Sequence, residues 1–181
     1  MWCEFSMSAI QSILSKPNRR IAGLALCIII CDQISKWFVM RDIYPNDEIS
    51  VIPGFFSLTH RANTGAAWSM FSGNNAVLAT VALTALVVLY LARHHFSAHR
   101  LLGQFAFGLI FGGIIGNLID RLMPGRHAVV DFLHFYMARR GTSDIFDFPA
   151  FNVADSAICT GVALIFLINW KEQPKPGANE K

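Results

Sequence analysis

The chain has 181 residues, of which 54% are hydrophobic and only 15% are charged. A typical soluble domain carries about 25% charged residues, so this composition excludes an ordinary soluble protein and indicates an integral membrane protein. The net charge of +3 is small and the basic residues lie in short segments, so no nucleic-acid partner is expected. The length suits a single membrane domain covering residues 1–181.

Four apolar runs are predicted as membrane-spanning helices, because each is close to the roughly 20 residues that cross a hydrocarbon core. They cover residues 21–40, 76–92, 101–118 and 152–170. The start of the first run resembles a signal peptide, but Leu26 stands where cleavage needs a small residue and the apolar run continues beyond it. We therefore expect a retained first span.

Basic residues beside the spans predict the orientation of the chain. They lie before span one (Lys16, Arg19, Arg20), between spans two and three (Arg93, Arg100) and after span four (Lys171, Lys175). The positive-inside rule then places both termini in the cytoplasm and loops 41–75 and 119–151 outside, although arginines in the second loop weaken the bias. The tail 171–181 is expected to be disordered.

The first outer loop is rich in β-branched and aromatic residues. Its runs 49–52, 55–60 and 66–71 are separated by Pro53-Gly54 and by residues 63–65, which are typical turn sequences. We expect a small antiparallel sheet on the outer membrane surface. The predicted fold class is a four-transmembrane-helix bundle with this extracytoplasmic sheet.

Several polar residues interrupt or end the spans. Asp32 and Lys36 are four residues apart, a spacing at which an acid and a lysine pair on one helix face. Adjacent Ser35 and Lys36 point about 100° apart, which disfavours a serine–lysine protease. Asn117, Asp120 and Arg121 mark the end of span three, where bracing of the helix end and a role in a site remain equal alternatives.

Other groups of residues favour structural roles. Gly108, Gly112 and Gly116 are spaced by four residues, which predicts close helix packing. His127, Asp131 and His134 lack the spacing of a metal-binding motif, so no metal and no other cofactor is expected. Asp144 and Asp147 are interpreted as solvated loop acids. The four cysteines form no CxxC pair and are expected to be free thiols in packed helices.

Asp131 and Asp155 are isolated acids in apolar surroundings at the outer edge of the spans. Because a carboxylate is costly there, a functional role is one hypothesis: two close carboxyl groups share a proton and act as base and acid on water and a leaving group. The alternative hypothesis is that Asp155 caps the fourth span and Asp131 is a loop acid. The residues alone leave both open.

Five ordered sequence blocks resemble lipoprotein signal peptidases, also called signal peptidase II, an aspartic peptidase family of the bacterial inner membrane. The blocks are residues 32–36 (DQISK), 63–67 (NTGAA), 112–121 (GGIIGNLIDR), 129–132 (VVDF) and 151–155 (FNVAD). The segment 137–144 is longer than the family pattern and departs from it. The glycine-x-glycine-aspartate signature of presenilin-like proteases does not occur in the chain.

The resemblance implies an activity and a set of site residues. Asp131 and Asp155 would be catalytic, with supporting roles for Asp32, Lys36, Asn63, Gly65, Asn117, Asp120, Arg121, Asn152 and Ala154. The substrates would be diacylglyceryl-prolipoproteins, and membrane lipids would surround the protein. A globomycin-type cyclic peptide would inhibit the enzyme. A monomer is expected, with the site at the outer face. A small transporter and a non-catalytic assembly protein are the alternatives from other classes.

Overall fold

The computed structural model describes residues 16–65, 73–93, 95–96, 98, 100–138 and 145–172. Four helices in it are long and apolar enough to cross a membrane. They are α2 (Lys16–Asp42), α3 (Asn75–Ala92), α4 (Leu101–Leu122) and α5 (Val153–Glu172). The four predicted spans are confirmed, and all four helices are longer than predicted, α2 and α4 by several residues. Residues after 172, where a disordered tail was expected, lie outside the described part.

The extra length of α4 carries polar residues into the helix. The prediction ended this span at Leu118, but the helix continues to Leu122 and buries both Asp120 and Arg121. These charged groups are tolerated because each has partners on neighbouring elements. Asp120 and Arg121 are therefore buried within the helix bundle, whereas the prediction placed them in the loop after the span.

The sheet has four antiparallel strands in the order β1-β2-β3-β4. The first outer loop contributes β1 (Glu48–Ile52) and β2 (Phe56–Asn63), as predicted. The prediction confined the sheet to this loop, whereas the second outer loop adds β3 (Val129–Ala138) and β4 (Ile145–Asp147). The run 66–71, which was also expected to be a strand, lies outside the described residues.

Backbone pairing brings the start of α5 beside β3. Leu133 and Phe151 form an isolated antiparallel bridge, in which the Leu133 amide donates to the Phe151 carbonyl at 2.8 Å and the reverse bond measures 3.0 Å. On its other edge β3 pairs with β2, with Val129 opposite Asn63. Segments 63, 129–133 and 151–155 therefore meet at one place.

Helix α4 is the centre of the bundle and packs closely against both α2 and α5. A side chain added at Gly112 would lie 2.7 Å from Ile28 Cβ, and one at Gly113 only 2.4 Å from the Ala154 carbonyl oxygen. These distances exclude a larger residue without separation of the helices. The predicted role of the glycines in close packing is confirmed.

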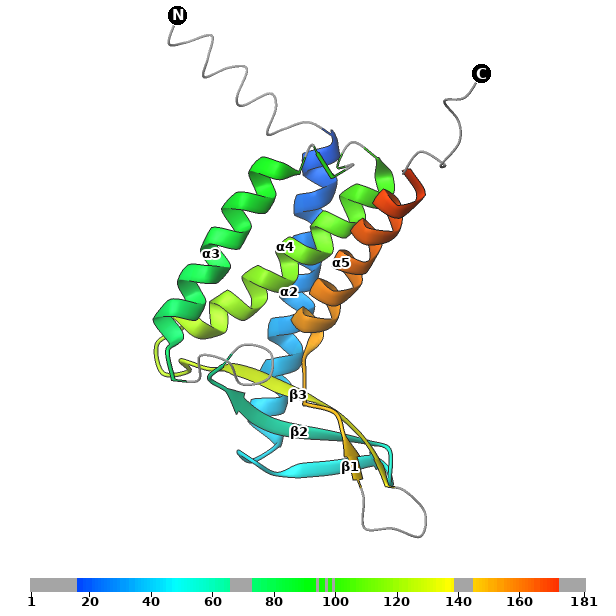
Figure 1. Ribbon diagram of the computed structural model, residues 1–181. Coiled ribbons are helices and arrows are strands. Elements are labelled where there is room, and N and C mark those ends of the chain that lie inside the picture. The colour runs from blue at the N-terminus through cyan, green and yellow to red at the C-terminus, as the bar shows by residue number, and fades with distance from the viewer. Residues whose placement is uncertain are drawn as a thin grey trace, which may run out of the picture.

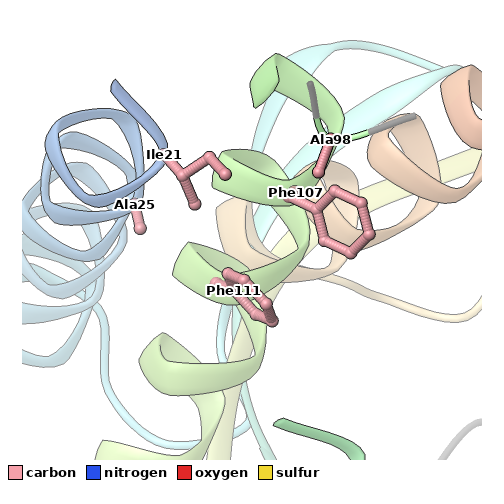
Figure 2. Packing of buried hydrophobic residues seen from close by; sticks show 5 residues of the cluster. All are labelled: Ile21, Ala25, Ala98, Phe107 and Phe111. Carbon is pink, nitrogen blue, oxygen red and sulfur yellow. The ribbon is translucent and has the colours of Figure 1, made fainter. Parts of the chain in front are cut away.

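Figure 1 shows the sheet at one end of the bundle, and the start of α2 and the last turn of α5 at the other end. Near that second end a cluster of buried apolar residues joins α2 to α4, and Figure 2 shows Ile21 of α2 directed toward Phe107 of α4. Cys27, Cys31 and Cys159 are free thiols, but they lie exposed on the outside of the bundle, where the prediction placed them in packed helices.

Candidate active site

Asp155 lies in the first turn of α5 and forms a reciprocal cap with Asn152. The Asp155 backbone amide donates to Asn152 Oδ1 at 2.9 Å, and the Asn152 amide donates to Asp155 Oδ2 at 3.2 Å. This arrangement satisfies two of the free amide groups at a helix N-terminus. Asp155 Oδ1 is left to accept from Asn117 Nδ2 at 2.7 Å. Asp155 therefore caps its helix with one oxygen and faces the polar site with the other.

Asp131 lies in β3 and is held by two asparagines. Its Oδ1 accepts from Asn152 Nδ2 and its Oδ2 from Asn63 Nδ2, both at 2.8 Å. Because Asn152 contacts Asp131 with its side chain and caps with Asp155, the two acids lie on either side of one fully buried residue. The interpretation of Asp131 as a solvated loop acid is excluded, since only 3% of the residue is exposed.

Burial and a like charge act together on Asp131. Desolvation raises the pKa of this carboxyl group to about 7, and the neighbouring charge of Asp155 adds to the increase. The hydrogen bonds from Asn63 and Asn152 oppose it, because they favour the ionised form. Near neutral pH the Asp131 carboxyl group is therefore neither fully ionised nor fully protonated.

The orientation of each asparagine amide follows from a donor on its other side. Asn117 Oδ1 accepts from Lys36 Nζ at 3.0 Å, and Asn63 Oδ1 accepts from the Gly65 amide at 2.9 Å. Asn152 Oδ1 accepts from the Asp155 amide. Since an ammonium group and a backbone amide can only donate, each side chain must turn its NH2 group toward a carboxyl group. The acids are thus surrounded by donors of fixed direction.

A charged layer lies beneath the asparagines. Lys36, Asp32 and Asp120 are completely buried, and Lys36 Nζ lies 2.7 Å from a carboxylate oxygen of each acid. The predicted pairing of Asp32 with Lys36 is confirmed. Asp120 Oδ1 also pairs with Arg126 Nη1 at 2.8 Å, so the layer holds two negative and two positive groups. This balance is what buried charges require.

Asp32 also connects α2 to the first turn of α5. Its Oδ1 accepts from the Ala154 backbone amide at 3.0 Å, and Ala154 itself is fully buried against α4. A second connection runs through Arg121, whose Nη2 donates to the Gly65 carbonyl at 2.6 Å. Through these contacts, all eleven residues predicted for the site lie in one connected region. The structure describes every one of them.

Three further residues join this region without having been predicted as site residues. Gln33 donates to Asp120, Arg126 pairs with the same acid, and Asn75 exchanges hydrogen bonds with Arg121. Gln33 stands inside the block 32–36, so the resemblance carried a signal that could have identified it. Asn75 and Arg126 lie in no recognisable pattern, so only the folded contacts identify them.

The histidine considered as a metal ligand belongs to a different cluster. His134 Nδ1 lies 3.2 Å from Ser57 Oγ, and His134 Nε2 contacts Asp147 Oδ1 at 2.5 Å. These contacts join β2, β3 and β4. The side chain of Asp147 is exposed, as expected for a solvated acid, but the residue lies in strand β4 and contacts His134, where the prediction placed it in a loop. Asp144 lies outside the described residues.

The chain is similar to known proteins over most of its length. The family model described as signal peptidase (SPase) II matches residues 24–171. A lipoprotein signal peptidase of Symbiobacterium thermophilum is 44% identical over 145 residues, covering 80% of this chain and 90% of the relative. One of Bacillus subtilis is 40% identical over 146 residues, covering 80% of this chain and 88% of the relative.

Solved structures agree with the sequence comparison. A bacterial membrane enzyme determined by the in meso method at 1.9 Å resolution is 33% identical, with a TM-score of 0.67 over 82% of this chain and 91% of that chain. The fold is therefore shared with a bacterial membrane enzyme, and the sequence relatives are lipoprotein signal peptidases. The chain belongs to the signal peptidase II family.

Proposed function

We propose that the chain is an aspartic endopeptidase that removes signal peptides from prolipoproteins, cutting before the diacylglyceryl-modified cysteine. Its relatives bear the name lipoprotein signal peptidase, which supports the substrate class. The observation that carries the proposal is the position of Asp131 and Asp155 on either side of Asn152, each held by amide donors of fixed direction. This is a setting in which two carboxyl groups act on one water.

In the proposed reaction, one acid is ionised and takes a proton from water, and that water attacks the scissile carbonyl. The other acid is protonated, donates a hydrogen bond to the carbonyl oxygen and then supplies a proton to the leaving amine of the lipidated cysteine. A pKa near 7 for Asp131 supports a shared proton at neutral pH. The two groups titrate as a pair.

The charged layer positions the dyad and does not touch the substrate. Lys36 holds Asn117 so that its NH2 group meets Asp155, and Asp32 holds the Ala154 amide one residue earlier in α5. Asp120 and Arg126 complete the charge balance around Lys36. Arg121 supports the Asn63–Gly65 turn that contacts Asp131.

The proposed location is the bacterial inner membrane, with both termini cytoplasmic and the dyad at the outer face. Support comes from the start of α2 and the last turn of α5, which both lie at the end of the bundle away from the sheet (Figure 1). The diacylglyceryl chains of the substrate would then lie in hydrocarbon beside the helices, gaining about 0.8 kcal/mol per buried methylene. The protein would act as a monomer and bind globomycin-type inhibitors.

The test uses purified Asp131→Asn and Asp155→Asn proteins, assayed on a prolipoprotein with and without its diacylglyceryl group. We expect each variant to lose at least a thousandfold in kcat, because neither neutral amide can exchange the proton. The unchanged enzyme should cleave only the lipidated precursor.

The matched control is Asp42→Asn, an exposed acid at the end of α2 that pairs with neighbouring Arg41. It should retain full activity. Full activity of either dyad variant, with thermal unfolding like that of the unchanged protein, would refute the dyad. Equal cleavage of both precursors would refute the proposed lipid requirement.

A further inference from the structure

A concave site lies in the half of the bundle away from the proposed dyad. It is a groove of about 500 Å³ between α2, α3 and α4. Its walls are mostly aliphatic and aromatic side chains, among them Ile21, Ala22, Leu86, Val87 and Phe111. Three residues of the apolar cluster drawn in Figure 2, Ile21, Ala25 and Phe111, also line this groove. Such a lining suits a hydrocarbon chain, and the groove shares no lining residue with the proposed active site.

One cation lies at the mouth of this groove. Arg93 follows the last residue of α3, with its guanidinium 3.9 Å from the centre of the Tyr90 ring and Nη1 donating to the Tyr90 carbonyl. Its Nε is buried but has no hydrogen-bond partner among the described residues. A buried N–H donor without an acceptor is energetically costly, so a bound molecule that offers an acceptor to Arg93 Nε would stabilise this point of the groove.

The position of Arg93 matches the level of lipid headgroups. Helix α3 has 18 residues and is therefore about 27 Å long, close to the thickness of the hydrocarbon core. Arg93 caps its end, and Leu86 lies roughly 10 Å deeper along the helix. A molecule with its polar group at Arg93 would thus have its apolar part against Leu86 and Phe111.

The charges at this end of the bundle select the sign of that polar group. Segments 16–31, 75–119 and 156–172 contain six lysines and arginines and a single acid, Glu172 at the end of α5. The cationic start of a signal peptide would be repelled there, and a zwitterionic headgroup would gain little. Basic pockets between helices at this membrane level attract anionic lipid headgroups.

We propose that this groove binds an anionic glycerophospholipid of the membrane, with its phosphate accepting a hydrogen bond from Arg93 and one acyl chain along α2, α3 and α4. The site is separate from the proposed catalytic dyad and from the lipid carried by the substrate. Its occupant would fill the space between α3 and the rest of the bundle.

The test measures binding of dioleoyl phosphatidylglycerol and dioleoyl phosphatidylcholine to the detergent-purified full chain by native mass spectrometry. We expect phosphatidylglycerol to bind at least fivefold more tightly than phosphatidylcholine, because one cation near the headgroup attracts its net negative charge. Arg93→Gln should abolish this preference, and Arg93→Lys should keep most of it. Arg41→Gln, at the opposite end of α2, should keep all of it.

A second pair of variants tests the groove itself. Val87 lines it and Val88 does not, although both are exposed valines of α3. Val87→Trp should weaken both lipids at least fivefold by filling the groove, while Val88→Trp should leave both unchanged. Equal affinity for the two lipids, equal effects of Arg93→Gln and Arg41→Gln, or equal effects of the two tryptophans would overturn the proposal. Displacement of phosphatidylglycerol by a lysine-bearing signal-peptide helix would also overturn it.

Discussion

At the level of single residues, Asn152 has two tasks that substitution can separate. Its Oδ1 caps α5 and its Nδ2 holds Asp131. Asn152→Ser keeps a capping oxygen but loses the NH2 group, so stability should change little while kcat falls tenfold or more, the worth of a hydrogen bond to a charged group. Asn152→Ala should lose activity and also about 1 kcal/mol of stability. Thermal unfolding and cleavage kinetics distinguish the two; equal melting temperatures would contradict the capping role.

The raised pKa of Asp131 predicts how stability depends on pH. In the folded chain this carboxyl group binds a proton up to about pH 7, whereas in an unfolded chain the pKa is about 3.9. Between these values the folded state holds more protons, so the free energy of unfolding falls as pH rises from about 4 to 7. Asp131→Asn removes this dependence, so the melting temperature of the variant minus that of the unchanged protein should increase as pH rises from 5 to 7. A constant difference across that range would contradict the burial of a titrating group.

At the level of elements, the helices were predictable and the complete sheet was not. Long apolar runs predict spans because membrane crossing depends on length and hydrophobicity within one segment. Strand β3 lies about 66 residues after β2, and its pairing depends on contacts that no local pattern records. In the same way, the blocks around Asp131 and Asp155 were recognisable, whereas Asn75 and Arg126 became site neighbours only through folding.

The close packing of α4 and α5 predicts a sharp contrast between two glycine substitutions. Gly113→Ala would place a methyl group 2.4 Å from the Ala154 carbonyl oxygen, so the helices must separate and disturb the Ala154–Asp32 hydrogen bond. We expect a loss of a few kcal/mol together with reduced activity. Gly23→Ala in α2 meets no atom within 4 Å and should stabilise by about 0.5–1 kcal/mol. Melting temperatures of both variants check this, and similar values would show that the packing is loose.

At the level of the whole molecule, one charge-balanced layer joins the parts that form the site. Asp32 and Lys36 come from α2, Asp120 from α4 and Arg126 from the segment before β3, and Asp32 also binds the start of α5. Because these groups are buried or nearly so, the loss of one charge leaves another without compensation. The second outer loop and three of the helices therefore depend on each other through electrostatics as well as apolar packing.

This dependence predicts non-additive stability. Lys36→Met leaves two carboxylates with Arg126 as their one positive partner in the layer, and it should lower the free energy of unfolding by about 3–5 kcal/mol. Asp120→Asn leaves an excess positive charge and should lower the free energy of unfolding by less. The double variant restores the balance between Asp32 and Arg126, so its cost should fall below the sum of the two by about 1–3 kcal/mol. Thermal unfolding of the four proteins in one detergent gives this coupling. Strict additivity would mean that Lys36 and Asp120 do not share one electrostatic unit, and the layer would then support the dyad by shape alone.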